Sequence, residues 1–224
     1  MADFVGVLEL IPAGCEKTGR CRLGQNFGFI DQSGTGWQAR KGLVTDGASI
    51  PSWARPLVGQ PFEKSFIKAA VIHDHYCDRH VRKWRQTHRV FYEALRASNV
   101  PKGKAGIMYF AVLVGGPKWV KLIKGKKCGL GDTCVFQLDV ASTIPNAQLT
   151  IDETGGLVAA RPPEFDSARF AAAMATNTPE LEAAGDSLTP EQVEKFAADA
   201  MAGDFFFENG DEIGTTLDVK VEVR

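Results

Sequence analysis

The four histidines of the chain fall within 16 residues, and a carboxylate lies beside the first of them. They are His73, His75, His80 and His88, and Asp74 directly follows His73. Histidine titrates near neutral pH and binds metal ions, while a carboxylate can hold a cation or orient a base. This combination is typical of a metal-assisted hydrolytic centre.

We predict one site built from Asp46, His73, Asp74 and His88. Asp46 lies in a turn-rich segment, where Gly47 permits tight turning. One aspartate with two histidines is a familiar ligand set for a catalytic zinc ion that keeps one position for water. We therefore expect Asp46, His73 and His88 as metal ligands. Asp74 is a further ligand or the general base, and His73 and Asp74 form the catalytic pair. Zinc is the first candidate metal, and calcium is the second.

Helical spacing predicts where the two central histidines lie. Apolar residues three and four apart predict a helix over residues 63–80 and a second over residues 85–98, with His73 and His88 on their apolar faces. On one continuous helix these histidines would be separated by a rise of about 22 Å. They can share a site only if the chain folds back near residues 81–83.

Other side chains near this site allow alternative interpretations. His75 and His80 are expected at the surface or behind the site. Ser49 as a nucleophile with His73 as its base is disfavoured, because its surroundings lack the strand and sharp turn of a nucleophile elbow. Cys77 is expected to be a small buried packing residue rather than a nucleophile. A buried polar network without catalysis also stays open.

The remaining pattern predicts an α+β fold, in which a small antiparallel sheet packs on a helical hairpin that carries the site. We divide the chain into a site-bearing domain, residues 1–140, and an acidic C-terminal α+β subdomain, residues 141–224. Further strands are predicted at residues 4–11, 20–32, 37–44, 134–140, 147–151 and 216–223, the last after a hairpin turn at 209–210. Further helices are predicted at residues 102–114, 164–175 and from a capping box at 189–192 to about 202.

The net charge of −1 hides a strong asymmetry. Residues 63–127 carry 15 lysines and arginines against 4 acidic residues, whereas residues 129–224 carry 5 against 18. The basic block either binds an anionic partner or pairs with the acidic block inside the molecule. It lacks the motifs that read a nucleic-acid groove, so we do not expect nucleic acid as the partner.

Two cysteine pairs share one spacing, Cys15 with Cys21 and Cys128 with Cys134. Each pair could close a small loop by a disulfide, the pairs could join each other, or all could be free thiols in a cytosolic protein. The N-terminus lacks the basic and apolar regions of a signal peptide. No run of 18 apolar residues occurs, so we expect no membrane span.

Five motifs resemble, in this order, the bacteriophage- and prophage-associated family called domain of unknown function 1353. They are residues 45–51, 69–74, 91–95, 108–109 and 115–119. The resemblance extends over about residues 4–120. It implies a phage setting, in the host cytoplasm or in a virion, but no established activity. Members of the family often carry aspartate where this chain has His88, and that departure favours a more zinc-like ligand set here.

A second resemblance is to the helix pair of secreted phospholipases A2, carried by His73, Asp74 and Tyr76 and by a polar residue before Phe91 on the next helix. It implies that His73 is the general base for water and that Asp74 holds calcium. His88 then takes the place of the carboxylate that orients the base. The calcium-binding loop of that family is not evident in this sequence.

These observations lead to three hypotheses about function. The first is a metal-dependent hydrolase that acts on the bacterial cell envelope, such as a phage-encoded peptidoglycan peptidase. The second is a calcium-dependent esterase similar to phospholipase A2. The third is a non-enzymatic virion or assembly protein, whose partners would be other phage virion proteins.

Overall fold

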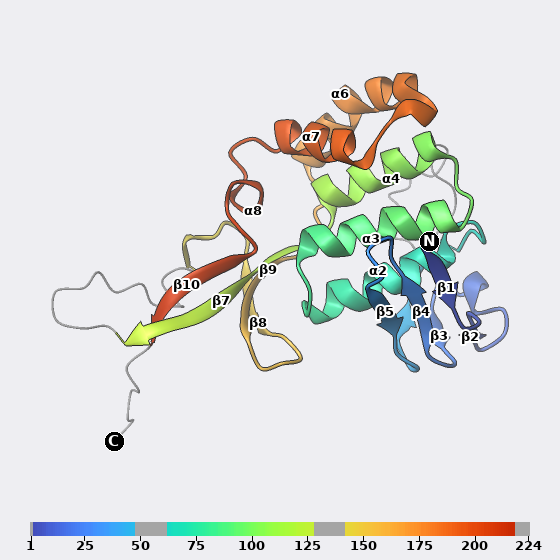
Figure 1. The fold of residues 1–224 in the computed structure, drawn as a ribbon, viewed down its shortest axis with the longest axis horizontal. Coiled ribbons are helices and arrows are strands. Elements are labelled where there is room, and N and C mark those ends of the chain that lie inside the picture. The colour runs from blue at the N-terminus through green and yellow to red at the C-terminus, as the bar shows by residue number, and fades with distance from the viewer. Residues whose placement is uncertain (1, 48–61, 128–141, 218–224) are drawn as a thin grey trace.

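The computed structural model of the chain describes residues 2–47, 62–127 and 142–217 (Figure 1). Its helices and small sheets form an α+β fold, which confirms the predicted class. The α-helices are α2 (Ile67–Arg79), α3 (Trp84–Ala97), α4 (Lys102–Gly115), α6 (Ala168–Ala184), α7 (Pro190–Ala200) and α8 (Phe205–Glu208). Two single 3-10 turns are η1 (Cys15–Lys17) and η3 (Gly185–Ser187).

Within the described residues, the strands form three small sheets. The first is antiparallel, with the order β1 (Asp3–Val5), β4 (Phe27–Ile30) and β5 (Gly36–Ala39). The second is also antiparallel, with the order β2 (Leu10–Ile11), β3 (Cys21–Leu23) and β6 (Val44–Thr45). The third has the order β10 (Glu212–Leu217), β7 (Lys118–Lys127), β9 (Leu157–Arg161) and β8 (Gln148–Ile151). In the third sheet β10 runs parallel to β7, and the other pairs are antiparallel.

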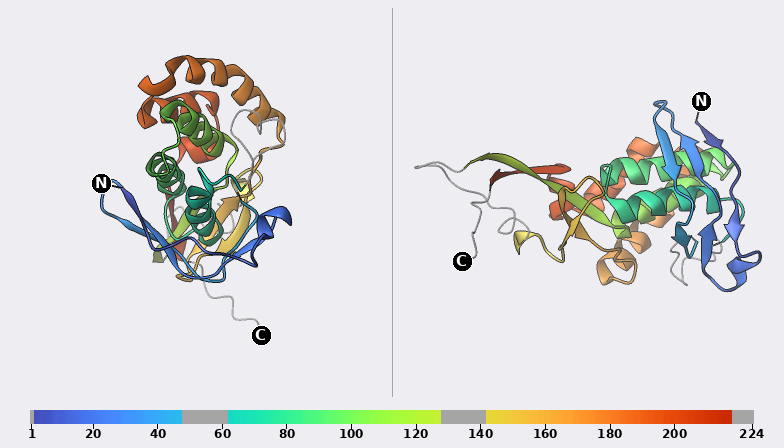
Figure 2. Two further views of the ribbon diagram at one scale, coloured as in Figure 1. Left: turned by 90° about the vertical axis from the view of Figure 1, so that its right-hand side faces the viewer. Right: turned by 90° about the horizontal axis from the view of Figure 1, so that it is seen from below.

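Helices α2, α3 and α4 form the centre of the molecule. The N-terminal strands lie on one side of them and α6 and α7 on another, as the further views in Figure 2 show. Strands β7 and β10 extend away from the helices (Figure 1). One continuous apolar core contains side chains from all of these layers, among them Phe29, Trp84, Tyr109, Phe170 and Val193.

The two helices of the site-bearing hairpin are separated by a short reversal of the chain. Helix α2 ends where His80 adopts a left-handed backbone with φ 53° and donates its N–H to the carbonyl of Tyr76. Lys83 is extended, and α3 starts at the next residue. The chain therefore folds back near residues 81–83, as the sequence predicts.

Several predicted elements differ from the structure. The strand expected at residues 4–11 is two short strands that belong to different sheets, separated by a turn in which Gly6 has φ 85°. The strand expected at residues 20–32 is also two strands, β3 and β4. The helix expected from residue 164 begins only after Ser167, whose side chain accepts a hydrogen bond from Phe170 N, and it then continues to residue 184.

The prediction of a hairpin at residues 209–210 is wrong. Helix α8 precedes this turn, and β10 pairs in parallel with β7 rather than with a neighbouring strand. Parallel pairing between distant segments is set by tertiary packing and leaves no local sequence signal. The strand expected at residues 134–140 lies outside the described residues, as does the end of the strand expected at 216–223.

The capping box that opens α7 is present, with Thr189 and Gln192 each bonded to the backbone of the other.

The basic block pairs in part with the acidic C-terminal segment, because Arg89 bonds to Glu191 at 2.6 Å and to Glu194 at 2.7 Å. Strands on both sides of residue 140 share the third sheet. The division into two subdomains there stays a prediction. None of the described helices combines the length and the apolar character that crossing a membrane requires.

Candidate functional site

His73 on α2 and His88 on α3 meet inside the helical hairpin. The distance from His73 Nε2 to His88 Nδ1 is 2.8 Å, and both side chains are buried. The apolar faces of the two helices pack on each other, so residues at similar heights before and after the reversal come together. The structure thus brings the two predicted histidines into direct contact.

The hydrogen bonds of His88 determine where its protons lie. His88 Nε2 is 3.1 Å from the carbonyl oxygen of Pro117, which can only accept, so Nε2 carries the proton. Burial, with smaller contributions from His73 and Lys118, lowers the pKa of His88 well below its usual value, so the ring is neutral. Its Nδ1 is therefore an acceptor, and His73 Nε2–H must be the donor. A neutral His73 is left with a lone pair on Nδ1.

Asp74 flanks this free nitrogen of His73. Its Oδ1 lies 3.6 Å from His73 Nδ1, and its Oδ2 accepts a hydrogen bond of 3.2 Å from the hydroxyl of Thr45. The same hydroxyl accepts a 3.0 Å bond from the backbone N–H of Gly47. This double use of one hydroxyl fixes the turn that carries Asp46 against helix α2.

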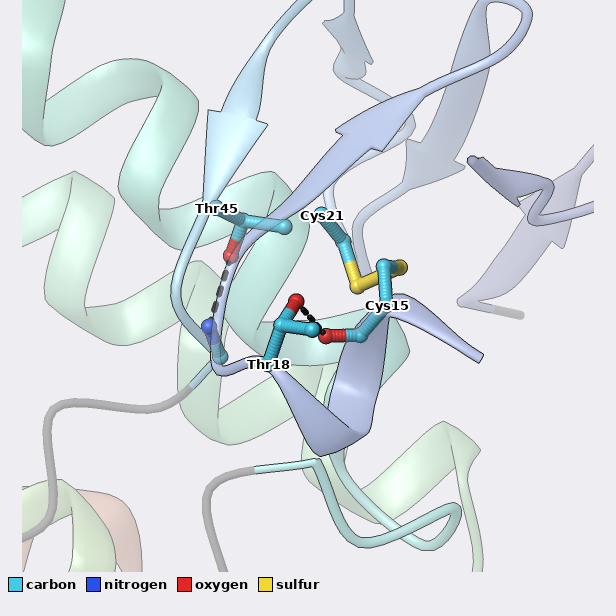
Figure 3. Close-up of a disulfide and its surroundings, with 5 residues drawn as sticks. Cys15, Thr18, Cys21 and Thr45 are labelled. Atoms are coloured by element: carbon cyan, nitrogen blue, oxygen red, sulfur yellow. Dashed lines mark hydrogen bonds between the residues drawn. A yellow bond between two sulfur atoms is a disulfide. The ribbon is translucent and has the colours of Figure 1, made fainter. Parts of the chain in front are cut away.

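The strand before Asp46 is anchored by a disulfide between Cys15 and Cys21. Cys21 pairs with Thr45 across β3 and β6, so the cross-link lies beside the strand that delivers the site turn (Figure 3). For Cys15 and Cys21, this disulfide confirms the possibility that a pair with this spacing closes a small loop. Cys128 and Cys134 lie outside the described residues.

Three carboxylates, those of Asp46, Asp74 and Asp78, line the same cavity as His73. Burial, and with a smaller contribution repulsion from Asp46, raises the pKa of Asp74. Burial and repulsion from Asp74 and Asp46 raise the pKa of Asp78 as well. Asp78 is not among the predicted site residues. Its spacing of four residues from Asp74 on one helix face could have indicated it.

The carboxylates and the histidine pair offer different ligand atoms, since Asp46 and Asp74 offer oxygen whereas His73, Cys77 and His88 offer nitrogen and sulfur. A cation bound by Asp46 and Asp74 would relieve the repulsion that helps to raise the pKa of Asp74, and carboxylate oxygens are the ligands calcium prefers. Two nitrogens that share one tetrahedral zinc ion lie about 3.3 Å apart. The 2.8 Å between His73 Nε2 and His88 Nδ1 is a hydrogen-bond distance instead.

Cys77 is the third potential metal ligand beside the histidine pair. Its Sγ lies 3.5 Å from His73 Nε2, and with His88 the three residues offer ligand atoms within 4.8 Å of one another. Burial, and then the charge of Asp74, raises the pKa of the Cys77 thiol well above its usual value. The thiol is buried and free, in agreement with the packing role expected from the sequence.

The other two histidines take different positions from each other. His75 is buried, not at the surface, and its Nε2 accepts a 2.6 Å hydrogen bond from Arg79. Burial, together with the charges of Arg79 and Arg40, lowers the pKa of His75 to about 4. His80 is half-buried, packs edge-on against Trp119 and lines the cavity beside the site. Ser49 lies outside the described residues.

A cavity of about 540 Å³ opens beside His73. Its polar wall comes from the N-terminal half of the chain and includes Thr45, Asp46, His73, Asp74, Asp78 and His80. Its apolar wall comes partly from α3 and α4, through Phe91, Met108 and Val112, and partly from the C-terminal half, through Leu149, Phe165, Phe170 and Met174. The cavity can therefore hold an apolar chain next to His73 and a group of carboxylates.

The comparisons with known proteins concern mainly the half of the chain that carries these polar groups. Residues 21–112 match a family described as protein of unknown function, DUF1353. The uncharacterized protein y4iH of Sinorhizobium fredii (strain NBRC 101917 / NGR234) is 51% identical over 113 residues, which are 50% of this chain and 47% of that protein. The uncharacterized protein y4jT of the same strain is 38% identical over 134 residues, which are 57% of this chain and 40% of that protein.

The chain thus spans less than half the length of these two relatives. No solved structure matches it significantly. The resemblance to the DUF1353 family that the sequence motifs predict is confirmed over residues 21–112, the part of the chain that contains Asp46, His73, Asp74 and His88.

Proposed function

We propose that this chain is a hydrolase in which Nδ1 of His73 takes a proton from the water that attacks an ester. The observation that carries this proposal is the chain of hydrogen bonds from His73 Nε2–H to His88 Nδ1 and from His88 Nε2–H to the carbonyl of Pro117. A base is effective when a neighbour fixes both its orientation and its tautomer. The arrangement agrees with the role that the phospholipase A2 resemblance implies for His73 and His88.

The substrate class follows from the cavity. Apolar side chains such as Phe91, Met108 and Phe170 line the space beside His73, which favours an ester that carries an apolar chain. His73 takes the proton of the attacking water and returns it to the leaving alcohol. His88 holds the ring in place during both transfers, and burial of the pair excludes competing solvent from its Nε2 side.

Asp46 and Asp74 are the residues that would hold a divalent cation, calcium first. Such a cation would polarise the ester carbonyl and stabilise the negative charge that develops on its oxygen. Asp74 would connect the cation with the base, because its Oδ1 lies 3.6 Å from His73 Nδ1 while its Oδ2 accepts a hydrogen bond from Thr45.

A zinc-dependent hydrolase of the bacterial cell envelope, such as a peptidoglycan peptidase, is the second candidate. Its supporting observation is the grouping of His73, Cys77 and His88 within the reach of one ion. Zinc there would require the two rings to separate by about 0.5 Å from their hydrogen-bond distance. A phage setting, or a structural role in a virion, rests on the family resemblance alone.

The test is hydrolysis of p-nitrophenyl hexanoate by the wild type and by two histidine variants, with EDTA, calcium or zinc present. We expect cleavage that calcium increases and that His73→Ala reduces about 10²- to 10⁴-fold. The matched control is His75→Gln, on the same helix but bonded to Arg79, which should stay within about threefold of the wild type. Equal activity of both variants, or no cleavage by the wild type with any metal, would reject the proposed base. Cleavage of peptidoglycan peptides with zinc alone would favour the second candidate.

A further inference from the structure

Strand β8 is the last strand of the third sheet, so only one of its two edges is paired. The backbone bond from Asp152 N to Gly156 O shows which residues of β8 bond to β9, because bonded pairs alternate along an antiparallel ladder. By this alternation Leu149 and Ile151 turn their N–H and C=O groups toward the free edge. None of the described residues forms a hydrogen bond with these groups.

The free edge of β8 lacks the features that normally prevent a strand from pairing. Proteins protect such edges with lysine, proline or a bulge. Strand β8 contains neither residue type, and its register with β9 is unbroken. Leu149 is 41% exposed and Ile151 is 69% exposed. Exposed apolar side chains beside free backbone groups are suited to binding another extended chain.

This edge borders the cavity that His73 lines. Gln148, Leu149 and Thr150 all line it. Successive side chains of a strand point to opposite faces, so a cavity against one face of a sheet would be lined by every second residue. Three lining residues in a row indicate that the cavity meets the strand itself. Strand β6, also the last strand of its sheet, borders the cavity in the same way through residues 44–46.

The charge of the cavity indicates which extended chain fits. Asp46, Asp74 and Asp78 line it, and none of them forms an ion pair with a lysine or arginine of the described residues. Asp46 and Asp78 are exposed. Within the same part of the chain no lysine lines the cavity, and the lining residue Arg161 is already paired with Asp204. A segment with a lysine or arginine would supply the missing positive charge.

We propose that an extended peptide with a basic side chain adds as a strand to the free edge of β8, and that this side chain pairs with Asp78. The backbone groups of Leu149 and Ile151 bind the peptide. A second copy of this chain could pair with the same edge, but its β8 carries no basic residue for the carboxylates. The inference goes beyond the proposed function, because the peptide binds whether or not it carries an ester that His73 can hydrolyse.

Binding of a blocked octapeptide of threonine and valine, with one central lysine, tests the proposal. It is titrated into the ¹⁵N-labelled full chain in EDTA, and amide exchange is followed by NMR. We expect slower exchange of the Leu149 and Ile151 amides. A peptide with glutamate in place of lysine should bind about fivefold more weakly. A peptide whose four central amides are N-methylated should bind at least tenfold more weakly, because it cannot donate the backbone hydrogen bonds.

Two variants with matched controls separate the backbone contact from the charge. Leu149→Pro removes an outward N–H that the fold does not use, and it should weaken binding at least tenfold. Leu149→Ile keeps this N–H and should bind within about twofold of the wild type. Asp78→Asn should bind the lysine and glutamate peptides equally. Asp199→Asn, which alters an exposed residue of α7, should keep the fivefold difference.

Equal binding of the lysine, glutamate and N-methylated peptides by the wild type would overturn the proposal, even if Leu149→Pro failed to fold. Protection on binding that spares residues 148–151 would overturn it as well. Light scattering of the chain without peptide tests the other occupant. A dimer that Leu149→Pro converts to a monomer would assign the edge to a second copy and contradict the proposal.

Discussion

The two walls of the cavity differ in how their polar groups are satisfied. On the α2 side, His73 Nε2 and both ring nitrogens of His88 have hydrogen-bond partners, and His73 Nδ1 faces the carboxylate of Asp74. On the β9 side, Arg161 is held by two carboxylates but keeps one nitrogen without a partner among the described residues. The first wall carries the base that we propose, and the second carries a buried guanidinium held by carboxylates.

The two walls also differ in what they share with other proteins. The polar wall lies within residues 21–112, which match the DUF1353 family, whereas Arg161 and Phe170 lie beyond that match. The chemistry that we propose therefore belongs to the shared region. Part of the apolar lining of the cavity comes from a segment that the family match does not include. The predictions below alter the first wall, the second wall and, for comparison, a contact away from both.

The largest effect is expected from the coupling of the two histidines. His73→Ala should lower ester hydrolysis about 10²- to 10⁴-fold, and His88→Leu should lower it about 10- to 100-fold because the base loses its fixed tautomer. The double variant should be no slower than His73→Ala, since His88 acts only through His73. Initial rates of the three purified variants measure this, and additive losses would show that His88 acts independently.

The second effect concerns the stability of the Arg161 wall. Asp204→Asn keeps the hydrogen-bond acceptor that caps α8 but leaves the buried guanidinium with a weaker partner. We expect a loss of about 3 kcal/mol in the free energy of unfolding and a melting temperature lower by about 6–12 °C. Adding Arg161→Met should recover at least half of this loss. Thermal unfolding would refute the account if the double variant were the less stable one.

Asp74→Asn should separate activity from stability on the first wall. Burial raises the pKa of Asp74, so its ionised form is penalised in the folded protein only. As the pH rises, Asp74 ionises in the unfolded chain at about pH 4, but in the folded protein only at its raised pKa. Over this pH range the wild type therefore loses stability relative to the asparagine variant. At neutral pH the variant should melt higher than the wild type and hydrolyse esters more slowly. A lower melting temperature for Asp74→Asn at every pH would contradict this.

The smallest effect is expected away from both walls, where α3 meets α7. Arg89 pairs with Glu191 and Glu194, but these partners are exposed enough for solvent to weaken the interaction. Arg89→Met should therefore cost about 1 kcal/mol in unfolding free energy and leave the rate of hydrolysis unchanged. Chemical denaturation measures the first quantity. A loss as large as that of Asp204→Asn would mean that this contact, and not Arg161, holds the C-terminal segment in place.

The polar wall could be predicted from the sequence because its parts are local. His73 and His88 lie on apolar faces of adjacent helices, and one short reversal brings them together, so periodicity was sufficient. Arg161 could not be predicted, because it reaches the cavity only through the pairing of β9 with β7 and of Asp204 with its guanidinium. For the same reason the parallel pairing of β7 with β10 was missed.

The central claim is that His73 donates from Nε2 and keeps its lone pair on Nδ1. Long-range proton–nitrogen NMR of the protein labelled with ¹⁵N-histidine reports the tautomer of each ring directly. We predict that His73 and His88 both donate from Nε2, and that added zinc leaves these signals unchanged. A His73 ring protonated at Nδ1, or zinc binding to His73 Nε2 and His88 Nδ1, would contradict the account.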